Sequence, residues 1–109
     1  MTEAAVIVDS VGDDALSVAV AGEIDMSNAP TVERQILEAI PNHLAEVTVD
    51  LSALDYIDSA GLRLLFALGT RLETLQIGLV LVVPTDSPVR RMIDLAGVAE
   101  LIHVQSALP

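Results

Sequence analysis

A chain of 109 residues with a hydrophobic fraction of 52% has the size of one domain and can bury a real core. Its 5 arginines and 16 acidic residues give a formal net charge of −11, which argues against nucleic acid and anionic membrane surfaces and favours a partner with a basic patch. The lack of cysteine excludes a disulfide framework and a thiolate metal site, and the lack of a signal peptide or membrane-length apolar run favours a cytoplasmic protein.

The first residues predict a β-hairpin. Apolar residues at 6–8, a Gly/Asp turn at 12–14 and alternating hydrophobicity over 16–20 indicate two antiparallel strands. The segment Gly22-Glu23-Ile24-Asp25 is expected to end the second strand in a loop.

A first helix is expected to follow this loop. Asn28 is a suitable N-cap, Pro30 is tolerated in a first turn, and Pro41 with Asn42 ends the helix. The apolar residues of this segment fall at helical spacing, which indicates one buried face: Val32, Ile36, Leu37 and Ile40.

The stretch 47–68 is the centre of the chain. Residues 47–51 predict a third strand, residues 50–58 an acidic turn, and residues 59–75 a second helix. Gly69 lies inside this helix at a cost of up to ~1 kcal/mol relative to alanine, and close packing on a sheet is the expected reason. The predicted buried stripe of the helix is Leu62, Leu65, Phe66, Gly69 and Leu72.

The last third predicts a strand, a helix and a final strand. Residues 79–83 are apolar throughout, which is typical of a central strand buried on both faces. Ser87 is the expected N-cap of a third helix with Pro88 at its first position, and Gly97 is its C-terminal cap. The buried stripe of that helix is predicted to be Val89, Met92, Ile93 and Ala96, and the chain is then expected to form a strand at 101–104 and a frayed tail at 105–109.

The predicted order of elements is therefore β-β-α-β-α-β-α-β. After the opening hairpin, strands alternate with helices, which implies right-handed crossovers and parallel strand pairs. We expect one α/β domain with a mixed β-sheet and with helices packed mainly on one face.

No catalytic constellation is evident, so an enzyme is not expected. His43 and His103 have no carboxylate at ligand or triad spacing, and each is expected at the surface. The run Ser59-Ala60-Gly61 lacks the first glycine of a nucleophile elbow, and no phosphate-binding glycine loop occurs. We therefore expect no metal site and no resident cofactor.

Two residues at the start of the second helix carry the functional argument. Either Asp58 or Ser59 could be its N-cap, a role worth ~1 kcal/mol. If Ser59 caps, its oxygen is tied to a backbone N–H. If Asp58 caps, the Ser59 hydroxyl is free to be modified. A phosphate there would meet unpaired N–H groups and about +0.5 of helix-end charge, and its added charge of about −1.5 to −2 would be repelled by an acidic neighbour.

Three segments in order resemble the STAS family, specifically its bacterial anti-sigma factor antagonists, and the likeness covers nearly the whole chain. The first is Gly22-Glu23-Ile24-Asp25. The second joins the strand at 47–51 to Tyr56-Ile57-Asp58-Ser59-Ala60-Gly61-Leu62, and the third spans 79–97 and ends in Met-Ile-Asp-Leu-Ala-Gly. The resemblance implies a single STAS-like domain over residues 1–109.

The resemblance also implies partner switching. An unphosphorylated antagonist of this family binds an anti-sigma factor with a histidine-kinase-like ATPase fold, so a sigma factor is freed. The anti-sigma factor also phosphorylates the antagonist on the serine after the aspartate, and a PP2C-type phosphatase reverses this. ATP would then be only a phosphodonor bound by the partner kinase.

Carried over by motif, the resemblance implies that Ser59 is the phosphate acceptor and that Asp25, Asp58 and Gly61 support the site. It favours Asp58 in the turn and Ser59 as the free hydroxyl. It further implies a contact face for the partner near the two helix starts, made of Glu23, Ser27, Asn28, Ala60, Leu62 and Arg63.

The sequence departs from the family pattern in two places. Ala60 stands where many members carry a second Ser or Thr, which focuses the prediction on Ser59. The chain ends soon after the last predicted strand, where many members have a further helix, so one sheet face is expected to be thinly covered, which favours weak homodimerisation. The alternative function is that of a STAS accessory subunit of an ABC-type lipid transporter, which docks on an ATPase and is not phosphorylated.

Overall fold

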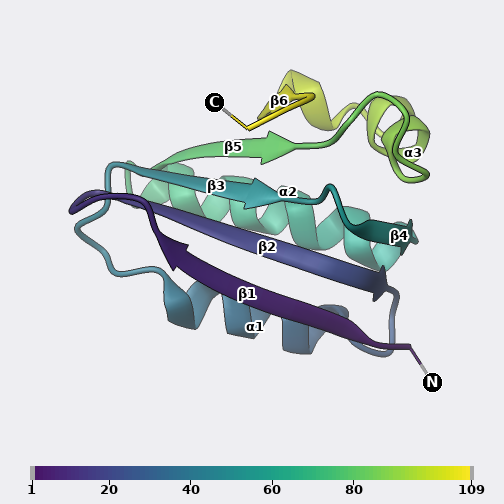
Figure 1. The fold of residues 1–109 in the computed structure, drawn as a ribbon, viewed down its shortest axis with the longest axis horizontal. Coiled ribbons are helices and arrows are strands. Elements are labelled where there is room, and N and C mark those ends of the chain that lie inside the picture. The colour runs from purple at the N-terminus through teal and green to yellow at the C-terminus, as the bar shows by residue number, and fades with distance from the viewer. Residues whose placement is uncertain (1, 109) are drawn as a thin grey trace.

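Five strands lie side by side in the order β1-β2-β3-β5-β6, and β4 pairs with the far end of β2 (Figure 1). This computed structural model describes residues 2–108. The strands are β1 (Ala4–Ser10), β2 (Ala15–Ile24), β3 (Glu46–Asp50), β4 (Leu54–Ile57), β5 (Gly78–Val82) and β6 (His103–Gln105). The helices are α1 (Ala29–Ala39), α2 (Ser59–Thr74) and α3 (Arg90–Leu95), with a short 3₁₀ turn, η1 (Val98–Glu100).

The sheet is mixed, as predicted from the alternation of strands and helices. β1 pairs antiparallel with β2, and the remaining pairs of the sheet are parallel. Every second residue of β2 near Val18 and Val20 is buried against the helices, which is the two-residue period of a strand. β5 lies between β3 and β6, so it is an inner strand, but Leu79 and Val80 are only half-buried and β3 occupies the middle of the sheet.

The strand β4 was not predicted, and it replaces part of the expected acidic turn at 50–58. Leu54 and Ile57 are fully buried, while Asp55 and Tyr56 between them are exposed. The two buried residues are three positions apart, which is not the two-residue period of a half-buried strand, so the sequence pattern conceals the element. β4 runs parallel to the end of β2, which therefore continues as a strand through Ile24 and does not end in a loop at Gly22.

Both long helices cover one face of the sheet, which confirms the predicted layering (Figure 1). α2 is buried more widely than the predicted stripe, because it packs on α1 as well as on the sheet. Leu64 and Leu68 are buried at 3% and 0% exposure, whereas Leu62 and Phe66 are only half-buried. The glycine within α2 does allow close packing, but against the side chain of Ile102, before β6, and not against the sheet: a Cβ at Gly69 would lie 2.9 Å from Ile102 Cδ1.

The C-terminal elements begin later than the sequence predicted. α3 starts at Arg90, because Ser87 and Pro88 form a preceding turn in which the Ser87 hydroxyl accepts a hydrogen bond from the N–H of Val89. Of the predicted stripe, Val89 and Ile93 are buried, while Met92 and Ala96 are exposed.

The ending of α3 follows the prediction, but the last strand is shifted. Gly97 has a φ of 77°, the left-handed conformation expected of a helix-terminating glycine. The final strand comprises His103–Gln105, so Gln105 belongs to the sheet and not to a tail. Of the predicted tail, Pro109 lies outside the described residues, as does Met1 at the other end of the domain.

A glycine in β2, paired with Ala4 of β1, should be indispensable. Gly22 has a φ of 101°, and a Cβ there would overlap the backbone carbonyl oxygen of Glu3. We predict that Gly22→Ala lowers the free energy of unfolding by about 2 kcal/mol or more, because both strain and overlap must be relieved. Urea unfolding followed by circular dichroism measures this loss. The matched control is Gly12→Ala in the hairpin turn, where a Cβ meets nothing within 4 Å. Equal losses for the two variants would contradict the prediction.

Candidate functional site

Asp58 ties together the three segments that form one end of the sheet. Its Oδ1 accepts hydrogen bonds from the backbone N–H groups of Ala60 at 2.9 Å and Gly61 at 3.1 Å, which makes Asp58 the N-cap of α2. Its Oδ2 accepts one from the N–H of Met26 at 3.2 Å, in the loop after β2. Its own N–H donates to the carbonyl of Ile24 at 3.2 Å. One aspartate therefore fixes the start of α2, the end of β4 and the loop that carries Asp25.

Ser59 is the first residue of α2, and its side chain is exposed. Sequence alone left Asp58 and Ser59 as alternative caps, and the hydrogen bonds assign the cap to Asp58. Among residues 2–108, no hydrogen bond to the Ser59 hydroxyl is present, so this oxygen is available at the surface.

The capping arrangement overturns one expectation about the helix start. A phosphate on Ser59 was expected to meet unpaired backbone N–H groups. The N–H groups of Ala60 and Gly61 are instead occupied by the carboxylate of Asp58, and that of Leu62 donates to the Asp58 carbonyl at 2.9 Å. Most backbone N–H donors of the first turn of α2 are therefore already hydrogen-bonded to Asp58.

Gly61 lets this first turn approach the end of the sheet. A Cβ at this position would overlap Cγ1 of Ile57 in β4 and would lie 3.1 Å from Cγ2 of Ile24 in β2. Any larger residue would push the start of α2 away from these two strands, so Gly61 sets where Asp58 and Ser59 stand.

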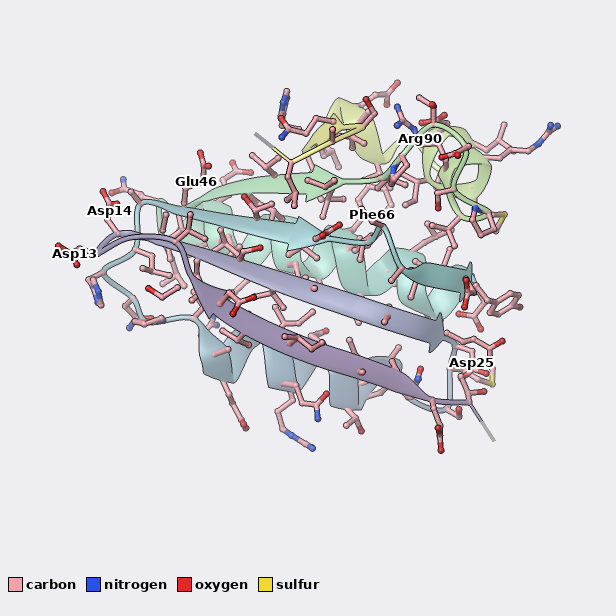
Figure 2. All side chains as sticks on the ribbon, in the orientation of Figure 1. Asp13, Asp14, Asp25, Glu46, Phe66 and Arg90 are labelled. Carbon is pink, nitrogen blue, oxygen red and sulfur yellow. The ribbon has the colours of Figure 1, made fainter. Side chains whose placement is uncertain are left out.

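Asp25 organises the loop between β2 and α1. Figure 2 shows it at one end of the sheet, with Asp13 and Asp14 at the opposite end. Its carboxylate accepts hydrogen bonds from the Ser27 hydroxyl, the Ser27 N–H and the Thr2 hydroxyl. The bonds from Ser27 and then Thr2 hold the pKa of Asp25 below its ordinary value, against a smaller opposing effect of burial. Because the folded pKa is lowered, this stabilisation is present above the ordinary aspartate pKa and is lost as the pH falls through the lowered one.

Asn28 occupies the N-cap position of α1, but its side chain does not cap the helix. Its Oδ1 accepts the N–H of Asp25 at 2.9 Å, and its Nδ2 donates to the carbonyl of Glu23 at 2.8 Å. Asn28 therefore joins the end of β2 to the loop that follows. It helps to hold Asp25 next to Met26, whose N–H donates to Asp58.

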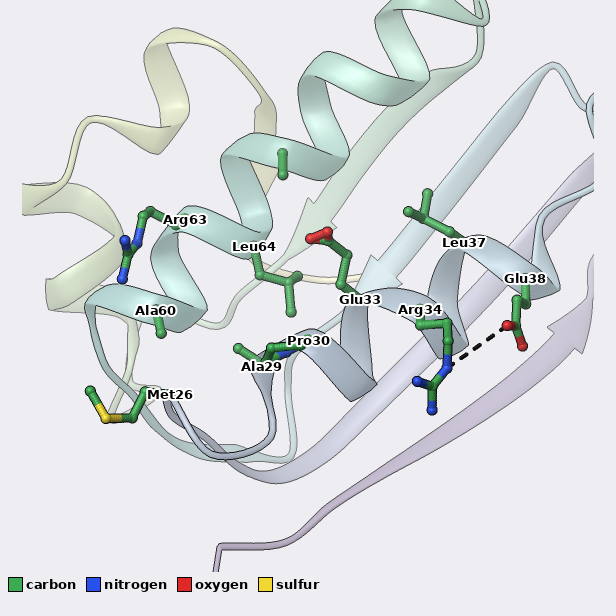
Figure 3. A pocket seen from close by; sticks show the side chains of 11 residues that line it. Met26, Ala29, Pro30, Glu33, Arg34, Leu37, Glu38, Ala60, Arg63 and Leu64 are labelled. Carbon is green, nitrogen blue, oxygen red and sulfur yellow. Dashed lines mark ion pairs between the residues drawn. The ribbon is translucent and has the colours of Figure 1, made fainter.

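An open groove of about 720 Å³ runs between α1 and α2 and begins beside the Ser59 turn (Figure 3). Two of the predicted contact residues, Ala60 and Arg63, line it. Of the others, Glu23 is exposed near the end of β2, Ser27 is exposed in the loop that follows, and Leu62 is half-buried in α2. The groove is lined by Met26, Ala29, Pro30, Glu33, Arg34, Leu37, Glu38, Ala60, Arg63, Leu64 and Ala67.

Met26 is the feature of this surface that the sequence analysis missed. It is 77% exposed at the mouth of the groove, which is unusual for a methionine. The available signal was an apolar residue placed between Asp25 and Ser27 in an otherwise polar loop.

The described part of the chain contains no cluster of three or more His, Cys, Asp or Glu side chains able to hold a metal ion. Over residues 2–108, no helix is long and apolar enough to cross a membrane.

Comparison with known proteins places this geometry in a family. Residues 6–109 match the STAS domain. The chain is 31% identical over 90 residues to the anti-sigma-F factor antagonist RsfB of Mycobacterium tuberculosis, covering 82% of this chain and 71% of the relative.

Two solved structures share the fold. The crystal structure of an anti-sigma factor antagonist from Mycobacterium paratuberculosis superimposes with a TM-score of 0.79 at 30% identity, covering 97% of this chain and 88% of the other. SpoIIAA of Bacillus in its phosphorylated form gives a TM-score of 0.65 at 19% identity, covering 94% of this chain and 92% of the other, and at that identity it supports the fold alone.

Removal of the Asp58 carboxylate should release the start of α2. We predict that Asp58→Ala lowers the free energy of unfolding by about 1–2 kcal/mol, because two helix N–H groups and that of Met26 lose their acceptor. Chemical denaturation gives the loss, and amide hydrogen exchange at Ala60 and Gly61 locates it. Asp55→Ala is the control, since Asp55 is exposed and its carboxylate accepts no hydrogen bond within residues 2–108. A loss of unfolding free energy no greater than that of the control would show that Asp58 does not stabilise the start of α2.

Proposed function

The chain belongs to the STAS domain family and is by homology an anti-sigma factor antagonist, and from this we propose that it is a partner-switching regulator turned off by phosphorylation of Ser59. In the unphosphorylated state it binds an anti-sigma factor, and a sigma factor is released. The anti-sigma factor has a histidine-kinase-like ATPase fold and is also the serine kinase, and a PP2C-type phosphatase restores the active form.

The observation that carries this proposal is the exposed hydroxyl of Ser59 on a helix start that another residue caps. Because Asp58 supplies the cap, the serine oxygen can react without unfolding the helix. In the reaction, the Ser59 oxygen bonds to the γ-phosphorus of ATP held by the kinase, ADP leaves, and the hydroxyl proton is released. The antagonist itself needs no base, metal or nucleotide site, because the partner supplies them.

The surface around Ser59 explains why a phosphate would weaken binding. Met26 and Ala60 line the mouth of the groove near Ser59, and the backbone N–H groups of both donate to the carboxylate of Asp58. A phosphate adds about −1.5 to −2 charges, which must be desolvated in a contact with the groove and which stand beside like charges. Both effects oppose the association that the unphosphorylated surface favours.

The contact face is proposed to extend from the end of β2, through the loop that follows, into the groove. Glu23 would contact the partner from the end of β2, Ser27 and Asn28 from the loop that follows, and Ala60 and Arg63 from α2. Leu62 would contribute through its half-buried position at the helix start.

Incubation with the cognate kinase and ATP should place one phosphate on the chain, at Ser59, as measured by mass spectrometry of peptides. Ser59→Ala should abolish the incorporation. Ser52→Ala is the matched control, because Ser52 is another exposed serine of the segment between β3 and α2 and its hydroxyl donates to Asp50. Phosphate on another residue, or capture of an ABC-type ATPase in place of a kinase, would refute the assignment.

The two states should be mimicked by substitution at Ser59. Ser59→Ala should cost no more than ~1 kcal/mol of stability and should keep full affinity for the anti-sigma factor in the presence of ATP. Ser59→Asp should weaken binding by roughly tenfold, or about 1.4 kcal/mol, since one carboxylate carries less charge than a phosphate. Isothermal titration calorimetry compares them. An aspartate variant that binds as tightly as the wild type would contradict the electrostatic explanation.

A further inference from the structure

We propose that Arg63 is the residue that binds the phosphate of phosphorylated Ser59, and that it leaves the groove between α1 and α2 to do so. This inference rests on the proposed phosphorylation of Ser59. It assigns Arg63 a role within the switch itself, in addition to any contact with the partner.

The first step is that the helix start has few donors to offer. The N–H groups of Ala60 and Gly61 donate to Asp58 Oδ1, and the N–H of Met26 donates to Asp58 Oδ2. A phosphate could use these donors only by displacing a carboxylate that holds three segments together. It would also stand beside Asp58 and close in sequence to Asp55, both of which carry the same sign of charge. A side-chain cation would therefore offset the phosphate charge more fully than the backbone donors that remain.

The second step is that Arg63 has the right spacing. It lies four residues after Ser59 in α2, so the two side chains share one face of the helix about one turn apart. An anion that precedes a cation at this spacing is the favourable orientation. Side chains in a helix lean toward its N-terminus, and Figure 3 shows the Arg63 guanidinium extended back toward the turn that carries Ala60.

The third step is that Arg63 is not committed elsewhere. It is exposed, and it has no ion pair within 4 Å in the described part of the chain. By contrast, Arg34 pairs with Glu38, and Arg90 pairs with Asp94 at 3.0 Å. Arg71 follows Ser59 by 12 residues in the same helix, which is about 18 Å at 1.5 Å per residue.

The move would also alter the groove. Arg63 is one of its lining residues at the end near Met26 and Ala60. A guanidinium that binds phosphate through two parallel N–H groups is held in a fixed direction, so it is withdrawn from a partner in the groove. Phosphorylation would then change the contact surface twice, by adding an anion at Ser59 and by removing a cation at Arg63.

The test installs phosphoserine at position 59 during translation, so that it does not depend on a kinase. The second pKa of the phosphate is then measured by ³¹P NMR titration in the full chain. With Arg63 in contact, this pKa is lowered, and Arg63→Gln should raise it by at least about 0.3 unit relative to the parent. Arg63→Lys should restore part of the shift. The ¹⁵N signal of the Arg63 side chain should move on phosphorylation.

Two matched variants complete the test. Arg71→Gln removes the same charge from the same helix and should leave the phosphate pKa within about 0.1 unit of the parent, since the charge is screened over that distance. Arg91→Gln tests the alternative cation in α3, because Pro88 and Met92 of that region line a hollow with Ser59. A shift for Arg63→Gln no larger than that for Arg71→Gln, or a larger shift for Arg91→Gln, would overturn the inference.

These outcomes are separate from those that bear on the proposed function. A kinase that ignores Ser59 would refute the proposed switch, while the titration would still report whether Arg63 binds a phosphate placed there. Conversely, phosphorylation of Ser59 with no Arg63-dependent shift would leave the switch intact and refute this inference alone.

Discussion

The carboxylate of Asp58 is the interaction on which the rest of this site depends. Its two oxygens accept three backbone N–H groups, two from the first turn of α2 and one from the loop after β2. Charge-assisted bonds of this kind are stronger than bonds between neutral groups. A single residue thereby joins the ends of β2 and β4 to the start of α2, and Ser59 lies exposed at this junction.

Several other elements and residues contribute to this junction of β2, β4 and α2. β4 extends the sheet alongside β2 just far enough to deliver Asp58 to the loop, and Gly61 permits the helix to start in contact with Ile24 and Ile57. Asn28 holds the same loop from its other side through bonds to Asp25 and Glu23. The Ser59 hydroxyl therefore lies on a helix and not in a loop, so the proposed kinase would meet it in one defined position.

Much of this could be predicted from sequence, because the relevant signals were local. Helix α2 and the turn at Gly97 follow from periodicity and glycine chemistry, and the position of Ser59 follows from the motif around it. The predictions that were wrong concern features that tertiary contacts determine. β4 is a strand because β2 offers it an edge, and Leu64 is buried because α1 lies against it. The choice of Asp58 as the cap depended on hydrogen bonds that Ser59 could equally have made.

The same junction determines which groups a phosphate on Ser59 would contact. A free helix start attracts anions through unpaired N–H groups, and the sequence predicts such a start at Ser59. With those groups already bound to Asp58, a phosphate on Ser59 gains little from the backbone and faces a neighbouring carboxylate. In the proposed switch, the helix start would hold the serine in place and would contribute little to stabilising its phosphorylated form. We propose that Arg63 supplies the compensation, and an arginine recruited from the groove would no longer be available to the partner there. In the proposed switch, the charge on Ser59 and the surface of the groove would be linked through a single turn of α2, so a local modification could alter the contact surface without a change of fold.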